Sequence, residues 1–92
     1  MNIEQLKFVF ETANKGTITA ASESLHVSQS AISQAISKLE MEVGYKIFQR
    51  SRTGISLTAE GAKVMPVIHE ILSRVDELKR IPNSQEQLKP FT

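Results

Sequence analysis

The sequence contains no cysteine, and this absence removes several classes of protein. A chain without thiols cannot form a disulfide scaffold, a thiolate zinc site or a cysteine nucleophile. It also has no uninterrupted apolar run long enough to span a bilayer. The N-terminal segment MNIEQLKFVF carries an acid and no cationic leader, so it is not a secretory signal. We therefore expect a cytoplasmic protein that makes no contact with a membrane.

Glycine and histidine are scarce, and their placement gives no signature of an enzyme. The four glycines are scattered, so the chain has no glycine-rich phosphate loop, and it has no Gly-x-Ser-x-Gly motif. His26 and His69 lie far apart and lack metal-ligand spacing with a carboxylate pair. We predict no catalytic residue, no metal site and no cofactor. A triad of His69, Asp76 and a serine remains an alternative, but nothing in the sequence supports it.

The composition fits one small globular domain. The chain has 92 residues, of which 40% are hydrophobic and 23% charged. Its formal net charge of +1 says little about nucleic acid. The segment from Lys46 to Lys63, however, also contains Arg50 and Arg52 and only one acid, Glu60. Such a basic strip attracts a phosphate backbone, although an ordinary solvated face has the same appearance.

Hydrophobic periodicity and capping residues predict three helices in the first half of the chain. Their ranges are 3–15, about 18–25 and 29–43. Asn2, Thr17 and Ser28 stand where each helix begins and can cap it. Gln5 completes a capping box with Asn2. Glycines follow the first and third helices and favour their ends.

The third predicted helix has two contrasting faces. The apolar stripe that we expect in the core consists of Ile32, Ala35, Ile36, Leu39 and Val43. The opposite face is polar, short and almost uncharged, with Gln29, Ser30, Ser33, Gln34, Ser37 and Lys38. A solvated face more often carries Glu–Lys pairs. On this feature alone, a binding face and a solvated face are equally consistent with the sequence.

A small hairpin and a long helix follow. Strand-forming residues predict strands at 46–50 and 55–57, joined by a turn with two arginines at or near its tip. A fourth helix over 59–81, capped by Thr58, continues through Pro66. Its apolar seam consists of Val64, Ile68, Ile71, Leu72, Val75 and Leu78. A helix of about 20 residues is about 30 Å long, so we expect this face to pair with a second copy. Packing on its own domain is the alternative.

This order of elements describes a mainly α fold, a winged helix-turn-helix of three helices and a two-stranded wing, followed by a long linker or dimerisation helix. The helix-turn-helix covers about 18–37. Helix 29–43 fits the major groove, where Gln29 and Gln34 can pair with adenine. The arginines of the wing can enter the minor groove or bind the backbone. We therefore predict sequence-specific binding of double-stranded DNA by a dimer. A protein-interaction module that uses the long helix is the alternative.

Five segments carry a family resemblance. They are GTITAASESLHVSQSAIS at 16–33, KLE at 38–40, VG at 43–44, IFQR at 47–50 and LTAEG at 57–61. Together they strongly resemble the LysR-type transcriptional regulators over about residues 1–80, with order and spacing kept. The resemblance implies a bacterial DNA-binding domain at 1–58 and a linker helix at 59–81 that pairs antiparallel with its twin, in a dimer or, in a full-length protein, a tetramer.

The resemblance also assigns roles to individual residues. It matches Gln29 and Ser33 to base or backbone contacts, Arg50 and Arg52 to the wing, and Thr19 to a backbone contact. The complete set of candidate DNA-binding residues, from the residues themselves and from the resemblance, is Thr19, Ser28, Gln29, Ser30, Ser33, Gln34, Ser37, Lys38, Arg50, Arg52 and Thr53.

The sequence departs from the common family pattern at two positions. Ser30 stands where proline is frequent, and Gln34 stands where arginine is frequent. We expect a weaker hold on phosphate and a different base preference. The family's large C-terminal effector-binding domain is absent, so the resemblance implies a fragment that ends in a hinge or tail at 82–92. A small-molecule inducer would act only through the absent domain.

Overall fold

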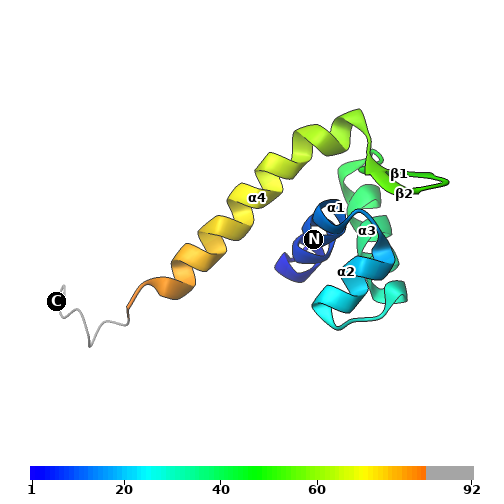
Figure 1. Cartoon of the computed structure of the whole chain (residues 1–92). Coiled ribbons are helices and arrows are strands. Elements are labelled where there is room, and N and C mark those ends of the chain that lie inside the picture. The colour runs from blue at the N-terminus through cyan, green and yellow to red at the C-terminus, as the bar shows by residue number, and fades with distance from the viewer. Residues whose placement is uncertain (83–92) are drawn as a thin grey trace.

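The computed structural model describes residues 1–82 and confirms the predicted fold class (Figure 1). Within that range the elements are α1 Ile3–Lys15, α2 Ile18–Leu25, α3 Gln29–Val43, β1 Phe48–Ser51, β2 Gly54–Leu57 and α4 Ala59–Arg80. The first three helices pack together, the two strands form the wing, and α4 leads away from this unit. Over the same range, none of the helices is long and apolar enough to cross a membrane. Apart from Pro82, the predicted hinge at 82–92 lies outside the described residues.

Local capping explains why the helices begin where the sequence predicts. Asn2, Thr17 and Ser28 each accept the backbone amide of the residue three positions ahead, at 2.8, 3.0 and 3.0 Å. Gly16 ends α1 in the left-handed region with φ of 83°. The predicted capping box is only half formed, because the Gln5 side-chain oxygen is buried without a hydrogen-bond partner. Gln5 lines the contact between α1 and α3 and does not turn back to the amide of Asn2.

One hydrophobic core joins the helices to the base of the wing. Its buried members are Leu6, Val9, Ala21, Ile32, Ile36, Leu39, Ile47, Phe48, Met65 and Ile68. The predicted stripe of α3 therefore faces the core, with Val43 only partly buried at its edge. This core fixes α3 so that its polar row faces outward.

The first strand of the wing begins two residues later than predicted. The antiparallel register runs from Phe48 opposite Leu57 to Ser51 opposite Gly54. Ile47 is not part of this ladder, because its amide donates to Glu40 Oε2 at 2.8 Å, although its carbonyl still accepts the Thr58 amide at 3.0 Å. The prediction of a strand from residue 46 was wrong for this reason.

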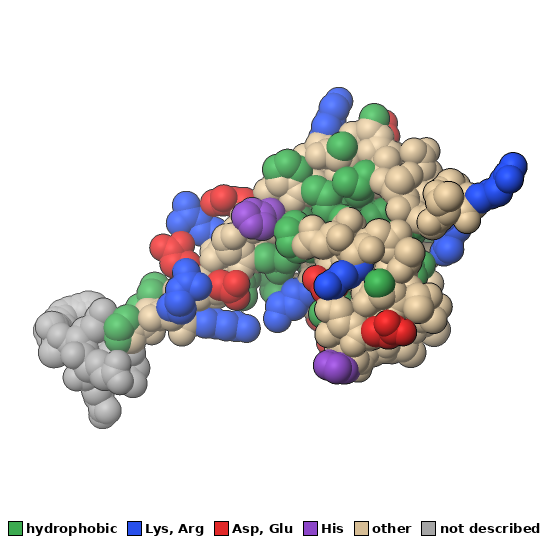
Figure 2. All heavy atoms as spheres, viewed as in Figure 1, with side chains coloured by type: hydrophobic (Ala, Val, Ile, Leu, Met, Phe, Trp, Pro, Cys, Tyr) green, Lys and Arg blue, Asp and Glu red, His purple; other side chains and the backbone are tan. Residues whose placement is uncertain are grey.

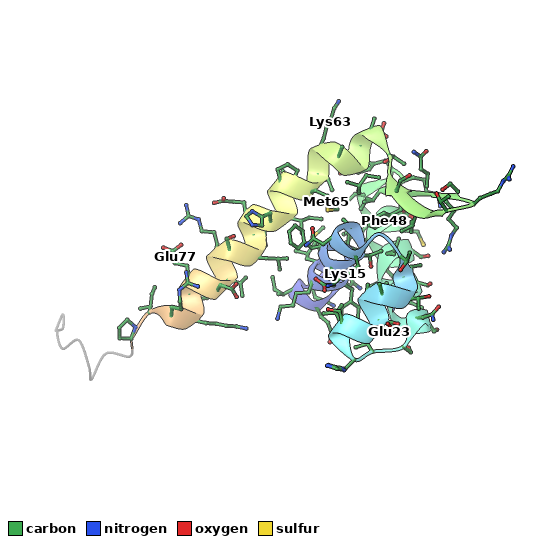
Figure 3. All side chains as sticks on the ribbon, in the orientation of Figure 1. Lys15, Glu23, Phe48, Lys63, Met65 and Glu77 are labelled. Atoms are coloured by element: carbon green, nitrogen blue, oxygen red, sulfur yellow. The ribbon has the colours of Figure 1, made fainter. Side chains whose placement is uncertain are left out.

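The helix α4 packs on the rest of the chain as far as Leu72. Met65 lies on the side of α4 that faces α1, whereas Lys63 points away from the domain (Figure 3). The helix continues through Pro66 and projects beyond the core, which gives the molecule a long axis of 58 Å. At its far end Leu78 is 70% exposed.

Candidate nucleic-acid interface

The polar row of α3 forms the first part of the candidate interface. We call this surface the outer face, and it is lined by Ser30, Ser33, Gln34, Ser37 and Lys38. All of these side chains are exposed except Ser33, which is partly buried. Gln34 Nε2 donates to Ser30 Oγ at 3.3 Å, one helical turn earlier. The amide oxygen and the second N–H of Gln34 are therefore left for an external partner.

A shallow groove between the wing and the starts of α2 and α3 forms the second part. We call it the wing groove. Its lining residues are Thr17, Ile18, Thr19, Gln29, Ser33, Arg50, Ser51, Arg52, Gly54 and Ile55. Ser33 also belongs to the outer face, so the two surfaces are continuous. The structure thus brings together five predicted residues from three separate elements: Thr19, Gln29, Ser33, Arg50 and Arg52.

Strand alternation explains why Arg50 faces this groove. Phe48 and Arg50 are two residues apart in β1, so their side chains leave the same face of the hairpin. Phe48 is buried in the core next to α3, and Arg50 lies beside Ser33 at the rim of that core. The Ile55 amide also donates to the carbonyl of Gly16 at 3.3 Å, which ties β2 to the corner before α2.

The electrostatics of this surface favour an anion. None of the residues that line the outer face or the wing groove is acidic. Lys38, Arg50 and Arg52 are exposed, and none of them forms an ion pair with a residue in the described part of the chain. Figure 2 shows basic side chains standing out at the end of the wing. Their charges are therefore free to meet phosphates.

Two candidate residues lie at the margin of the surface. Ser28 is exposed, but its hydroxyl oxygen already accepts the Ala31 amide as the cap of α3. Thr53 lies in the wing turn, with its hydroxyl 3.2 Å from that of Ser51. Neither residue lines the outer face or the wing groove.

Sequence reasoning missed some residues of the wing groove. The sequence predicts only a capping role for Thr17 and only a place in a turn for Ser51, although both residues line the groove. The hairpin register would have identified Ser51, since it places this residue opposite Gly54 and next to Arg50. The contact between the groove and the α1–α2 corner had no signal in the local sequence.

The predicted dimer residues divide into two groups along α4. Ile68 is buried in the core of its own domain, and Val64, Ile71 and Leu72 pack partly against that core. Val75 is partly buried, and Leu78 is exposed. A contact with a second copy therefore stays a prediction, and Leu78 is the most exposed of these six side chains.

The histidines lie away from the candidate interface. His69 stacks on Phe10 of α1 with ring centroids 5.5 Å apart. His26 is exposed in the turn before α3, with φ of 58°. Among the described residues, no group of three or more His, Cys, Asp or Glu side chains is placed to hold a metal ion.

A three-helix unit with a two-stranded wing and a polar, locally basic face defines a winged helix-turn-helix protein. A family model for bacterial regulatory helix-turn-helix proteins of the lysR family matches residues 3–62. The chain therefore belongs to this family. Because the family consists of regulatory proteins, its match also confirms that the chain is not an enzyme.

Curated relatives agree with this assignment. The HTH-type transcriptional regulator CzcR of Bacillus thuringiensis is 36% identical over 81 residues, which are 88% of this chain and 27% of that protein. The regulator ClcR of Pseudomonas putida is 35% identical over 81 residues, again 88% of this chain and 27% of that protein. The chain spans 27% to 31% of the length of such curated relatives.

Solved structures show the same fold. The chain aligns with CbnR, a LysR family transcriptional regulator, with a TM-score of 0.83 and 34% identity over 86% of this chain and 27% of that one. It also aligns with the CbnR_DBD–DNA complex, with a TM-score of 0.82 and 34% identity, over 86% of this chain and 91% of that one.

Proposed function

We propose that this chain binds double-stranded DNA sequence-specifically, as the DNA-binding part of a transcription regulator. In this proposal α3 enters the major groove and its outer face reads base edges. The wing arginines, Arg50 and Arg52, meet the minor groove or the phosphate backbone beside it. One observation carries the proposal. The outer face and the wing groove form a continuous surface of hydroxyl, amide and unpaired basic side chains without an acid.

The relatives support this proposal. The CbnR_DBD structure is a complex with DNA, and this chain covers 91% of its length at 34% identity. A second complex, of BenM_DBD with benA site 1 DNA, aligns with a TM-score of 0.80 and 26% identity, over 85% of this chain and 91% of that one. This chain therefore aligns with nearly the whole length of the protein that is bound to DNA in each of those two structures.

We further propose how the chain is organised. Residues 1–58 are the winged helix-turn-helix domain, and residues 59–81 are a linker helix through which two copies form a homodimer. In a full-length protein the dimers assemble into tetramers, and a small-molecule inducer acts through the C-terminal domain. Such a regulator works in the bacterial cytoplasm, where the DNA is. The exposed Leu78 on α4 supports the dimer because burial of such a side chain is favourable.

A salt titration of DNA binding tests the proposal against a protein-interaction module. The probe is a fluorescein-labelled duplex of mixed sequence, about 30 base pairs long, which leaves room for two half-sites one helical turn apart. With about six phosphate contacts per dimer, the affinity should fall about a thousandfold between about 50 and 200 mM salt. The slope of log affinity against log salt concentration should become shallower by about 2 in Arg52→Ala, because one phosphate contact is lost from each protomer.

Arg80→Ala is the matched control for that titration. Arg80 is also an exposed arginine, but it lies at the opposite end of α4 from the wing (Figure 1). Its replacement should leave the slope unchanged. Absence of binding, or binding that does not depend on salt, would contradict DNA binding and favour the protein-interaction module.

A further inference from the structure

Glu40 is the one acid on α3 that lies largely inside the fold. Its side chain is 10% exposed and lies near the C-terminal end of α3. Glu40 Oε2 accepts the amides of Ile47 at 2.8 Å and of Phe48 at 3.2 Å. Glu40 Oε1 lies 3.6 Å from Lys46 Nζ. A buried carboxylate is costly unless it is hydrogen-bonded, and bonds from amides to a charged acceptor are strong.

The same short segment is held from the side of α4. The Thr58 hydroxyl donates to the carbonyl of Lys46 at 2.6 Å, and the Thr58 amide donates to the carbonyl of Ile47 at 3.0 Å. Gly61 brings the α4 backbone so close that a Cβ there would lie 2.1 Å from the Ile47 oxygen. Residues 46–48 are therefore held between α3 and the start of α4.

The rest of the wing has few other attachments. Beyond residue 48, the hairpin has its own short ladder, its apolar contacts and the bond from the Ile55 amide to Gly16. An isolated two-stranded hairpin is marginally stable in water. The position of Arg50, two residues after Phe48 in β1, thus depends on how firmly residues 47 and 48 are held.

We propose that Glu40 is a positioning residue for DNA binding, which fixes the wing beside α3 so that both can contact one duplex. This inference rests on the proposed function. Glu40 acts through Arg50 and Arg52 and does not itself touch DNA, because its carboxylate is engaged by backbone amides and Lys46. Phosphates are spaced regularly along a duplex, so a displaced wing loses its contacts while those of α3 remain.

The sign of the effect of Glu40→Ala on DNA affinity is the first test. Removal of an acid near a polyanion should strengthen binding if only charge matters. A positioning role predicts the reverse, a dissociation constant about tenfold higher for the mixed-sequence duplex at about 50 mM salt, because the wing contacts are lost. Glu40→Gln keeps an oxygen acceptor and should restore most of the affinity, with a loss of about threefold or less.

A double-mutant cycle then asks through which residues Glu40 acts. Arg52→Ala should weaken the wild type about fivefold but the Glu40→Ala variant by less than about twofold. Lys38→Ala, a matched change on α3, should cost the same factor in both backgrounds. A full Arg52 effect in the Glu40→Ala background, or stronger DNA binding by Glu40→Ala, would overturn the inference. If Glu40→Ala does not fold by circular dichroism, the cycle is run with Glu40→Leu, which removes the acceptor and keeps an apolar side chain in the buried site.

Hydrogen exchange without DNA separates this inference from the proposed function. The wing amides, from Gln49 to Leu57, should exchange about tenfold faster or more in Glu40→Ala, while those at the centre of α3 keep their protection. Unchanged wing exchange would overturn the positioning role even if the wild type binds DNA. Conversely, a wild type that fails to bind DNA while Glu40→Ala loosens the wing would refute the proposed function alone.

Discussion

Ser28 lies where the turn of the helix-turn-helix meets α3, and its side chain links the fold to the candidate interface. Its Oγ accepts the Ala31 amide at 3.0 Å, which satisfies one of the free amides at the start of the helix. The hydroxyl hydrogen is not used in this bond, and the hydroxyl donates to no other group within residues 1–82. The same side chain can therefore cap α3 and donate to a phosphate.

Replacement of Ser28 by alanine should destabilise the domain by about 1 kcal/mol, because the Ala31 amide loses its partner. Ser37→Ala is the matched control, since Ser37 is exposed in the middle of α3. Alanine is a better helix former there, so the control should change stability by less than about 0.5 kcal/mol. Urea denaturation followed by circular dichroism measures both values. Equal effects of the two substitutions would refute the capping role.

At the start of α4, a tertiary contact determines which residues are tolerated. Thr58 caps the helix by accepting the Gly61 amide at 2.9 Å. Gly61 itself is buried, and its backbone approaches the carbonyl of Ile47. Helix propensity alone would favour alanine at this position by about 1 kcal/mol. The close approach to Ile47 opposes that preference.

Gly61→Ala should therefore destabilise the protein by about 2 kcal/mol or more, despite the gain in propensity. A Cβ at 2.1 Å from the Ile47 oxygen cannot be accommodated without a shift of backbone. The adjacent exposed residue provides the control, because Ala62→Gly should cost only the propensity difference of about 1 kcal/mol. The midpoint temperatures of thermal unfolding of both variants test this prediction. A Gly61→Ala variant as stable as the wild type would show that the start of α4 does not pack closely on Ile47.

Elements with local signals were predictable from the sequence, and those with distant partners were not. The starts of α1, α2 and α3 follow from caps that bond three residues ahead. The start of β1 depends on contacts of Ile47 with Glu40, seven residues before it, and with Thr58, eleven residues after it. Local patterns carry no information about such partners, so the predicted strand began too early.

The same division holds for the candidate interface. The outer face lies on one helix and follows from the helical period. The wing groove is assembled from three elements, and the sequence could name Arg50 and Thr19 through the family resemblance but could not place them together. The role of Glu40 required its burial and its two amide partners, which the sequence does not reveal.

At the scale of the whole molecule, α4 separates the candidate DNA-binding surface from the proposed dimer contact. The wing and the far end of α4 lie at opposite ends of the long axis (Figure 1). Arg74 forms ion pairs with Glu70 at 3.0 Å and with Glu77 at 2.9 Å on the exposed part of the helix. These hydrogen bonds, first with Glu77 and then with Glu70, raise the pKa of Arg74.

Leu78→Asp should dissociate the proposed dimer. Burial of a leucine is worth roughly 1.5–3 kcal/mol, and a symmetric contact loses it on both protomers, so the dissociation constant should rise by about a hundredfold or more. Ser73→Asp adds the same charge on another face of α4 and should leave the dimer intact. Sedimentation velocity measures both variants. A wild type that sediments as a monomer, or equal effects of the two changes, would contradict a dimer through α4.

Selection from random duplex DNA at about 0.15 M salt, with wild type and Gln34→Ala side by side, tests the central claim most directly. If α3 reads base edges, the wild type should enrich an inverted repeat with an adenine preference at one position per half-site. Gln34→Ala should lose that preference and keep the others. Retention without enrichment, or an unchanged preference in Gln34→Ala, would contradict base reading by the outer face of α3.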